Sequence, residues 1–430
     1  MSTPMKIYLV APVMMLALGS MAEAQAPPTT TPPPFGFSLP STEGTLTYSL
    51  SASESVLTGY ENSGVGTTTS LSGSLGYLSS SPNKPFSLVY SGGYLYSTVA
   101  GYPGSSTFQN LAASQVLTTK NWNFVVDDAV SYLPEAPTTG LSGIPGVGDI
   151  GVGSVQIGDE PTQSILTNYA TRVGNGLNGG ATRRINGDWS MNGSASWQIL
   201  QFIGGGGINS SVETGSAGPS YRIDALSSAS ANVMYSYTND TYGGNSYPFE
   251  AEGITLQYQR QLSRFLSVNV AAGPQRTFGS GSTSSLIPSQ ITVIGNAGVS
   301  YVRRSTTLSA GYARATNGGS GVVYGALTDS VSGSVRRTFG SDWQGALTAS
   351  YSRSTALAKI AGADENYRST YGGGQLSRRL GRDFSAFFSY TAVTQSEGST
   401  GVTQAAFNGL SQTFAVGITY SPGALHLGHF

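Results

Sequence analysis

The sequence predicts an all-β fold, a transmembrane antiparallel up-and-down β-barrel, on three observations. Only 10% of the 430 residues are charged, well below the roughly 25% of soluble domains. Glycine is abundant, at 58 residues. From residue 44 onward, apolar and small polar residues alternate with the period-two pattern of a strand. A helical membrane protein needs apolar runs of about 20 residues, and none follows the N-terminal region, so a barrel with an apolar outer face fits best.

The N-terminal region has the features of a secretory signal. Lys6 precedes the apolar run "IYLVAPVMMLALGSMA", and Ala22-Glu23-Ala24 has the small-x-small form of a signal-peptidase site. We expect cleavage after Ala24. The absence of cysteine excludes a lipoprotein anchor, disulfides and thiolate metal sites. The expected organisation is a signal peptide (1–24), a proline-rich periplasmic tail (25–43), the barrel (44–421) and a C-terminal tail that ends on Phe430 (422–430).

Alternation also predicts which face of each strand meets lipid. In "QTFAVGITYS" (412–421), Phe414, Val416 and Ile418 share a face with Tyr420, and small residues occupy the other face. In a barrel the apolar face meets lipid and the small polar face lines the lumen. The same parity predicts lumen positions that are mostly uncharged, for example Thr255, Gln257, Gln259, Ser330, Ser332 and Ser334.

Basic turns recur along the chain: "TRRINGDW" (182–189), "VRRTFGSDW" (335–343) and "SRRLGRDF" (377–384). We interpret them as short periplasmic turns whose arginines extend to lipid phosphates; a docking surface for a periplasmic or assembly partner is the alternative. The aromatic girdles predicted at the two membrane interfaces are Trp189, Trp343 and Phe384 just after these turns, and Tyr312, Tyr351 and Tyr390, each 39 residues apart, at the opposite end. Arg314 and Arg353, two residues beyond their tyrosines, are expected to extend to the polar outer leaflet.

Eighteen strands are predicted, with sixteen as the alternative because 208–239 is ambiguous. Short turns are expected at the periplasmic end and longer loops at the extracellular end. The predicted strands are 45–57, 67–79, 85–99, 108–120, 121–133, 164–183, 188–201, 208–221, 227–239, 251–262, 265–276, 288–303, 305–316, 322–336, 342–355, 365–380, 383–395 and 406–421.

A barrel of this size is too wide for side chains to fill, which leaves an aqueous channel. The loop 134–163 is long, rich in glycine and apolar residues, and we expect it to fold into the lumen and narrow the pore; an ordinary surface loop is the alternative. Its acids would then influence selectivity opposite candidate lumen arginines. The candidate constriction residues are Glu135, Asp149, Asp159, Glu160 and Arg172, with Arg368 as a second arginine.

The stretch "NFVVDDAVSY" (123–132) conflicts with the barrel pattern. Asp127 and Asp128 are adjacent, so a regular strand points one of them at lipid, where a carboxylate is unfavourable. Three explanations remain: a β-bulge turns both inward, this face contacts another subunit, or the predicted strand is misplaced.

Catalytic and metal-binding chemistry find little support in the sequence. The two histidines, His426 and His429, lie in the last five residues, away from the outer rim, and the glycines at 204–207 lack the Lys-Ser/Thr of a phosphate-binding loop. The net charge of −1 argues against a nucleic-acid partner. We therefore expect no enzyme, no cofactor and no metal site.

The signal peptide, the proline-rich start, the repeated "RR" turns and the terminal Phe430 resemble those of the outer-membrane β-barrel porins of Gram-negative bacteria. In particular, the chain is similar to uncharacterised barrels found with exopolysaccharide or exosortase loci. The resemblance, one of pattern over roughly 44–430, implies a C-terminal signal read by the barrel-assembly machinery, at Tyr420 or Phe430. The alternation stops near Tyr420, so the form of this signal departs from that class.

The expected function is therefore a porin-like channel of the Gram-negative outer membrane for passive diffusion of small polar solutes. Export or anchoring of exopolysaccharide, and a non-conducting structural or adhesive barrel, are the alternatives. The expected partners are outer-membrane lipid, the barrel-assembly machinery, and small polar solutes or glycan; a second copy of the chain, as a homo-oligomer, is the further candidate.

Overall fold

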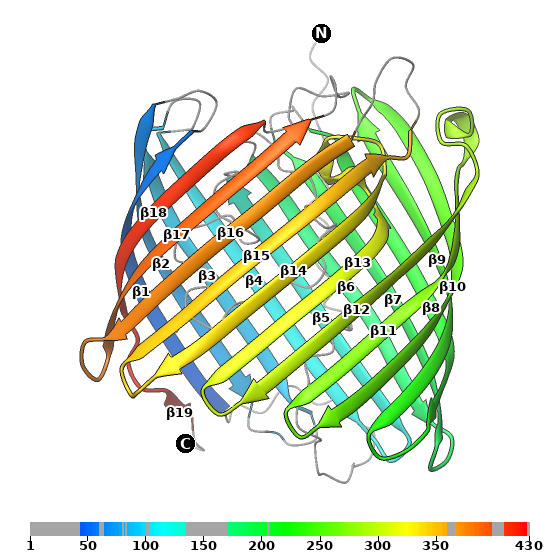
Figure 1. The fold of residues 1–430 in the computed structure, drawn as a ribbon, viewed down its shortest axis with the longest axis horizontal. Helices are drawn as coiled ribbons and strands as arrows, with labels where there is room; N and C mark the ends of the chain where they lie inside the picture. Colours follow the sequence, from blue (N-terminus) through cyan, green and yellow to red (C-terminus); the bar gives the residue numbers. More distant parts are fainter. Residues whose placement is uncertain are drawn as a thin grey trace.

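The computed structural model describes residues 44–59, 64–79, 81, 84–99, 104–134, 171–203, 207–358, 366–397 and 408–427. Within these residues, eighteen strands close into one antiparallel barrel (Figure 1). They are β1 (Gly44–Thr58), β2 (Val65–Ser79), β3 (Phe86–Ser97), β4 (Ser105–Thr118), β5 (Trp122–Pro134), β6 (Thr171–Arg184), β7 (Trp189–Phe202), β8 (Asn209–Arg222), β9 (Ser227–Tyr242), β10 (Asn245–Ser263), β11 (Leu266–Gly279), β12 (Gln290–Arg303), β13 (Thr306–Asn317), β14 (Ala326–Phe339), β15 (Trp343–Ala356), β16 (Asn366–Arg379), β17 (Phe384–Glu397) and β18 (Gly409–Tyr420).

Each strand pairs with the next along the chain, and β1 pairs with both β2 and β18. This last pairing, from Leu50↔Tyr420 to Thr58↔Gln412, closes the barrel. The prediction of eighteen strands is confirmed, and the ambiguous region 208–239 forms two ordinary strands, β8 and β9. A short further strand, β19 (Leu425–Leu427), pairs with the start of β1.

The two ends of the barrel differ as expected. In Figure 1 the short turns lie together at the lower end, which we call the periplasmic end, and the longer connections lie at the upper, extracellular end. The turns at the periplasmic end include 185–188, 223–226 and 340–342. The strands tilt across the wall, as closure of a barrel requires.

Side-chain exposure follows the predicted parity. On β18, Phe414, Val416 and Ile418 are exposed on the outer face while Thr413, Ala415 and Thr419 are buried toward the lumen. On β10, Ile254 and Leu256 are likewise exposed, which places Gln257 on the inner face. The alternation in the sequence therefore reports the two faces of the wall correctly.

The hairpin of β9 and β10 extends further than predicted. Its turn is Gly243-Gly244, with φ of 58° and 83°, whereas the alternation predicts a longer loop from 240 to 250. Two glycines with positive φ form the two-residue turn that suits a twisted hairpin. Pro248 pairs with Asn239 of β9, but β11 pairs with β10 only from Phe249 onward, so the missing N–H of Pro248 costs no ladder bond on that side.

No helix among the described residues is long and apolar enough to cross a bilayer.

Candidate functional site: the barrel lumen

Hydroxyl groups recur along the inner wall of the barrel, beside inward apolar residues such as Leu95, Phe108 and Phe387. On β1 the inward positions include Ser49, Ser51, Ser53 and Ser55 in succession. Hydroxyl groups on neighbouring strands form hydrogen bonds with oxygen–oxygen distances of 2.6–3.0 Å. These pairs are Ser49–Ser74, Ser51–Thr419, Thr68–Ser97, Ser194–Ser216, Ser309–Ser334, Thr328–Ser354 and Ser352–Ser369. Each hydroxyl can donate and accept hydrogen bonds, so the wall offers both functions to a solute without a fixed charge.

Charged side chains are few in the body of the lumen. Among the side chains that the structure describes, the inward-facing charged residues away from the periplasmic end are Asp127, Arg172 and Asp240. Arg172 is 5% exposed, and Asp240 is fully buried. Away from the periplasmic end, the described part of the lumen therefore has little net fixed charge.

The paired arginines of the periplasmic turns point in opposite directions. Arg183 lies over the ring of Trp122 on the outer face, at 5.5 Å, and Arg378 lies over Trp343, at 5.2 Å. Arg337 lies over Phe339 in the same way, at 5.4 Å. The neighbour of each of these arginines has the inward parity, because consecutive residues of a strand face opposite sides. These inward neighbours, all exposed, are Arg184, Arg336 and Arg379.

The connection between β13 and β14 folds into the extracellular mouth. It contains the short 3-10 turn Gly319–Gly321 and the fully buried Val322 and Val323. Glycines at 319, 321 and 325 have φ of 73°, 81° and 63°, which residues with a Cβ rarely adopt. The side chains that it covers, including Phe249 and Tyr367, belong to the inner faces of β10 and β16.

Three polar contacts hold this connection in place, one of them from the backbone N–H of Leu357 to the carbonyl oxygen of Gly325 at 3.0 Å. The backbone N–H of Gly325 donates to Oδ2 of Asp240 at 3.0 Å, and the N–H of Ile208 donates to the carbonyl oxygen of Gly321 at 2.8 Å. The rings of Tyr324 and Tyr247 lie 4.0 Å apart between centroids, and burial, together with a hydrogen bond to Tyr247, raises the pKa of the Tyr324 phenol. We call residues 318–325 the mouth loop.

The two sides of the lumen differ in accessibility. Inner-face residues of β2, β4 and β5, such as Ser70, Asn110 and Ser131, are at most 2% exposed. Inner-face residues of β14 and β15, such as Ser332 and Thr348, are exposed. A solute in the lumen would therefore meet the wall formed by β14 and β15 directly.

The outer face shows the aromatic residues expected of a membrane interface. Trp189, Trp343 and Phe384 are exposed next to the periplasmic turns, and Tyr312 and Tyr351 are exposed on the outer face toward the other end. Tyr312 and Tyr351 lie in register through Val331. Tyr390 does not continue this row. Tyr351 pairs with Thr370 of β16, and Thr370 pairs with Thr394 of β17, four residues away from Tyr390. The girdle role of these side chains stays a prediction.

Asp128 faces outward. The pairings of β5 with β4 and β6 run without interruption through Asp127 and Asp128, which excludes both a bulge and a misplaced strand. Asp127 lies on the inner face across from Ser114. On the outer face, Nδ2 of Asn175 donates to Oδ1 of Asp128 at 2.8 Å and to the carbonyl oxygen of Ala129 at 3.1 Å.

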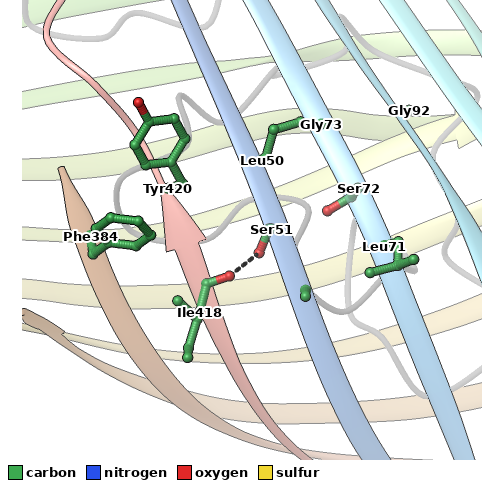
Figure 2. Close-up of a pocket in the computed structure, with 10 residues that line it drawn as sticks. Leu50, Ser51, Leu71, Ser72, Gly73, Gly92, Phe384, Ile418 and Tyr420 are labelled. Atoms are coloured by element: carbon green, nitrogen blue, oxygen red, sulfur yellow. Dashed lines mark hydrogen bonds between the residues drawn. The ribbon is translucent and has the colours of Figure 1, made fainter.

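A shallow depression of about 500 Å³ lies on the outer wall where β1 meets β18 (Figure 2). Gly73 and Gly92 pair across β2 and β3 and leave its floor without side chains. Its other lining residues are Leu50, Ser51, Ala52, Leu71, Ser72, Phe384, Ile418 and Tyr420. The Oγ of Ser51 donates to the carbonyl oxygen of Ile418 across the seam at 3.4 Å. Because its apolar side chains belong to the lipid-facing parity, this depression is separate from the lumen.

Most of the predicted constriction lies outside the described residues, namely nearly all of the loop 134–163 with Glu135, Asp149, Asp159 and Glu160. The assembly-signal candidate Phe430 also lies outside them. The prediction that Arg368 faces the lumen is wrong: it shares the outer parity of Leu376 on β16, and the lumen side of that strand is occupied by residues such as Tyr367. Arg172 has the inner parity and pairs across β6 and β7 with the inward Phe202.

Sequence reasoning missed the mouth loop. The stretch "NGGSGVVYGA" (317–326) has the signal that could have revealed it, since two valines and a tyrosine between glycines are too apolar for an exposed loop. Among the described residues, no group of three His, Cys, Asp or Glu side chains could hold a metal ion.

Comparison with known proteins gives only a distant likeness. No family model and no curated protein matches the chain. Similar solved structures include Pseudomonas aeruginosa OccK2 (OpdF), at 12% identity, 87% of this chain, 98% of that chain and a TM-score of 0.42. Acinetobacter baumannii OccAB3 has 10% identity over 88% of this chain and 99% of its own, with a TM-score of 0.42. Pseudomonas aeruginosa OpdK with vanillate has 9% identity over 88% and 99%, with a TM-score of 0.43. At these scores the likeness carries no functional conclusion, and the topology above comes from the strand pairings of this chain.

Proposed function

We propose that this chain is a porin-like channel of the Gram-negative outer membrane through which small polar solutes diffuse passively. One observation carries the proposal: a closed eighteen-strand barrel whose inner wall, in the described residues, carries repeated hydroxyl pairs and few charges away from the periplasmic end. A barrel of this strand number is too wide to be filled by its own side chains. A polar lumen inside an apolar outer wall suits an aqueous path across a bilayer.

The wall chemistry favours neutral or weakly charged solutes. A hydroxyl-lined wall can replace part of a solute's hydration, because each Ser or Thr both donates and accepts. With little fixed charge away from the periplasmic mouth, the body of the described lumen presents neither a strong electrostatic barrier nor a strong attraction to ions. Sugars and other polyhydroxylated solutes have the matching donors and acceptors.

The direct test is solute flux into proteoliposomes that contain the refolded mature chain. We expect swelling with neutral monosaccharides, at a rate that falls with solute size. Entry of a neutral hexose should be at least as fast as that of a hexuronate of similar size. An impermeable vesicle with correctly folded protein would contradict the proposal, and strong preference for the charged solute would contradict the role given to the hydroxyl wall.

The loop 134–163 remains our candidate constriction, with Glu135, Asp149, Asp159 and Glu160 facing Arg172. Its glycine-rich, apolar composition supports an inward position, because such a segment is costly in water. Removal of residues 136–160 should raise single-channel conductance. Unchanged conductance would remove this loop from the mechanism.

Targeting and assembly follow from the sequence. We propose that the signal peptide is cleaved after Ala24, that the C-terminal strand ending at Tyr420, or Phe430 itself, is read by the barrel-assembly machinery, and that outer-membrane lipid surrounds the wall. N-terminal sequencing of the membrane-extracted protein tests the cleavage site, and a mature chain that begins elsewhere than Gln25 would contradict it. A homo-oligomer is a further possibility that the outward Asp128 raises.

A further inference from the structure

The outer wall carries a row of charged side chains near the extracellular end of β13 to β16. Arg314, Asp329, Arg353 and Arg368 are paired in direct register across these four strands. All four have the outer parity, shared with the exposed Tyr312, Val331, Tyr351 and Leu376. With three arginines and one carboxylate, the formal charge of the row is 3 − 1 = +2. We call it the arginine row.

In the part of the chain that the structure describes, Arg314 is the one arginine of the row that has a carboxylate partner. Nη1 of Arg314 lies 3.2 and 3.3 Å from the two carboxylate oxygens of Asp329, which also accepts a 2.7 Å bond from the hydroxyl of Tyr312. Among the described residues, no carboxylate lies within salt-bridge distance of Arg353 or Arg368. Both side chains are exposed.

Arg353 and Arg368 lie directly opposite each other on β15 and β16. Directly opposed residues on antiparallel strands have Cβ atoms about 5 Å apart, and like charges at that separation are destabilising. An anion shared between the two guanidiniums removes this repulsion. Guanidinium groups bind phosphate with paired, charge-assisted hydrogen bonds.

The position of the arginine row along the strands indicates the source of this anion. Arg353 lies two residues beyond the exposed Tyr351, and Arg314 two residues beyond Tyr312. Interfacial tyrosines sit at the level of lipid headgroups, so the arginines lie at the headgroup layer, on the face that contacts lipid.

A second sector of the outer wall has the opposite charge. Glu213, Glu250 and Glu252 have the outer parity on β8 and β10, with Arg276 paired to Glu252 at 3.3 Å. Toward the extracellular end of the described wall, the net positive charge therefore lies on β13 to β16 and not on β8 and β10.

We propose that the arginine row binds the phosphate groups of a phosphorylated lipid of the outer leaflet, with Arg353 and Arg368 sharing one phosphate. The inference depends on the proposed outer-membrane location. It does not depend on conduction through the lumen, because every residue of the row lies on the outer wall.

The test is native mass spectrometry of the full mature barrel, released from mild detergent after incubation with bisphosphorylated lipid A. The double variant Arg353→Gln/Arg368→Gln should bind this lipid about tenfold more weakly or worse, since it removes two charge-assisted contacts. Arg353→Lys/Arg368→Lys should retain most of the binding. Arg276→Gln, at a similar level in the acidic sector, is the matched control and should bind as the unmodified protein does.

Two further arms identify the ligand. Lipid A without its phosphates should bind much more weakly to the unmodified barrel, and millimolar inorganic phosphate alone should fail to displace bisphosphorylated lipid A. Equal adducts for the Arg→Gln variant, or equal binding of the two lipids, would overturn the proposal; displacement by inorganic phosphate would assign the row to free phosphate instead. Conductance of the same variants, measured in parallel, should be unchanged, which separates failure here from failure of the channel proposal.

Discussion

A single residue step decides what each arginine of the periplasmic turns contacts. Arg183 and Arg378 lie on aromatic rings of the outer wall, while their neighbours Arg184 and Arg379 face the periplasmic mouth of the lumen. This follows from strand geometry alone, since consecutive side chains point to opposite faces. The "RR" repeat therefore serves two surfaces: one arginine of each pair lies on an aromatic ring of the outer wall, and the other places positive charge at the periplasmic mouth of the lumen.

The opposite orientation of the pairs predicts an effect on ion selectivity. The channel should prefer anions modestly at about 0.1 M salt, where the Debye length is about 10 Å, and the preference should fade toward ~1 M as screening increases. The variant Arg184→Gln/Arg336→Gln/Arg379→Gln should lose this preference. Reversal potentials across a salt gradient measure it. The adjacent outward set, Arg183→Gln/Arg337→Gln/Arg378→Gln, is the control, and an equal effect from that set would contradict the assignment.

Asp128 gives a second prediction at this scale. A charged side chain on the lipid face costs up to ~2–4 kcal/mol for Arg or Lys and less for an acid, so Asp128→Leu should raise the free energy of unfolding from bilayers by ~1 kcal/mol. Asp127→Leu, one residue away on the inner face, should not stabilise the barrel. Urea-driven unfolding of the two variants in lipid vesicles makes the comparison. A loss of stability for Asp128→Leu, together with a change in oligomeric state, would instead place this face against a second subunit.

At the scale of elements, the period-two alternation predicts the strands but not the conformation of the connections at the extracellular end. The mouth loop lies against inner-face residues of β10 and β16 and against Asp240 of β9, all distant in sequence. Of the three polar contacts that hold it in place, the one that involves a side chain is the hydrogen bond from the Gly325 N–H to the carboxylate of the fully buried Asp240, which we call the anchor.

The anchor can be tested by removing or keeping its acceptor. Asp240→Ala leaves the Gly325 N–H without a partner, which costs ~1–3 kcal/mol when the donor is buried, so amide exchange at 318–325 should accelerate and channel noise should rise. Asp240→Asn keeps an oxygen acceptor and should behave like the unmodified protein. Hydrogen exchange resolved by mass spectrometry reads out the loop directly. Exchange in the alanine variant that is as slow as in the original chain would show that the apolar contacts of Val322 and Val323 suffice.

The strands could be predicted from the sequence because period-two alternation is a local signal. It located all eighteen strands, and it identified the outward row of Phe414, Val416 and Ile418. The mouth loop could not be predicted in this way, because its position depends on contacts with residues more than 60 positions away, such as Phe249. The prediction for Arg368 is wrong because one arginine in a strand does not show which face it occupies. The pairing of β16 with β15 is needed to assign that face.

At the scale of the whole molecule, the outer wall and the lumen have separate chemistries. The outer wall combines exposed apolar and aromatic side chains with charged residues near its two ends. The lumen, in the described residues, has paired hydroxyls and few charges away from its periplasmic end. Within the described residues, the pairing of β1 with β18 joins the first and last strands of the barrel, so the wall has no open side, as a bilayer requires of a β-structure. A lumen of this composition predicts an open pore that discriminates by size more than by charge.

The measurement that tests this account most directly is the single-channel conductance of the refolded mature protein in a planar bilayer, with its reversal potential in a gradient of potassium chloride. The account predicts steady openings with a linear current–voltage relation and nearly equal permeability to potassium and chloride at high salt. Folded protein that inserts but conducts no current, or a pore that passes one ion almost exclusively at high salt, would contradict it.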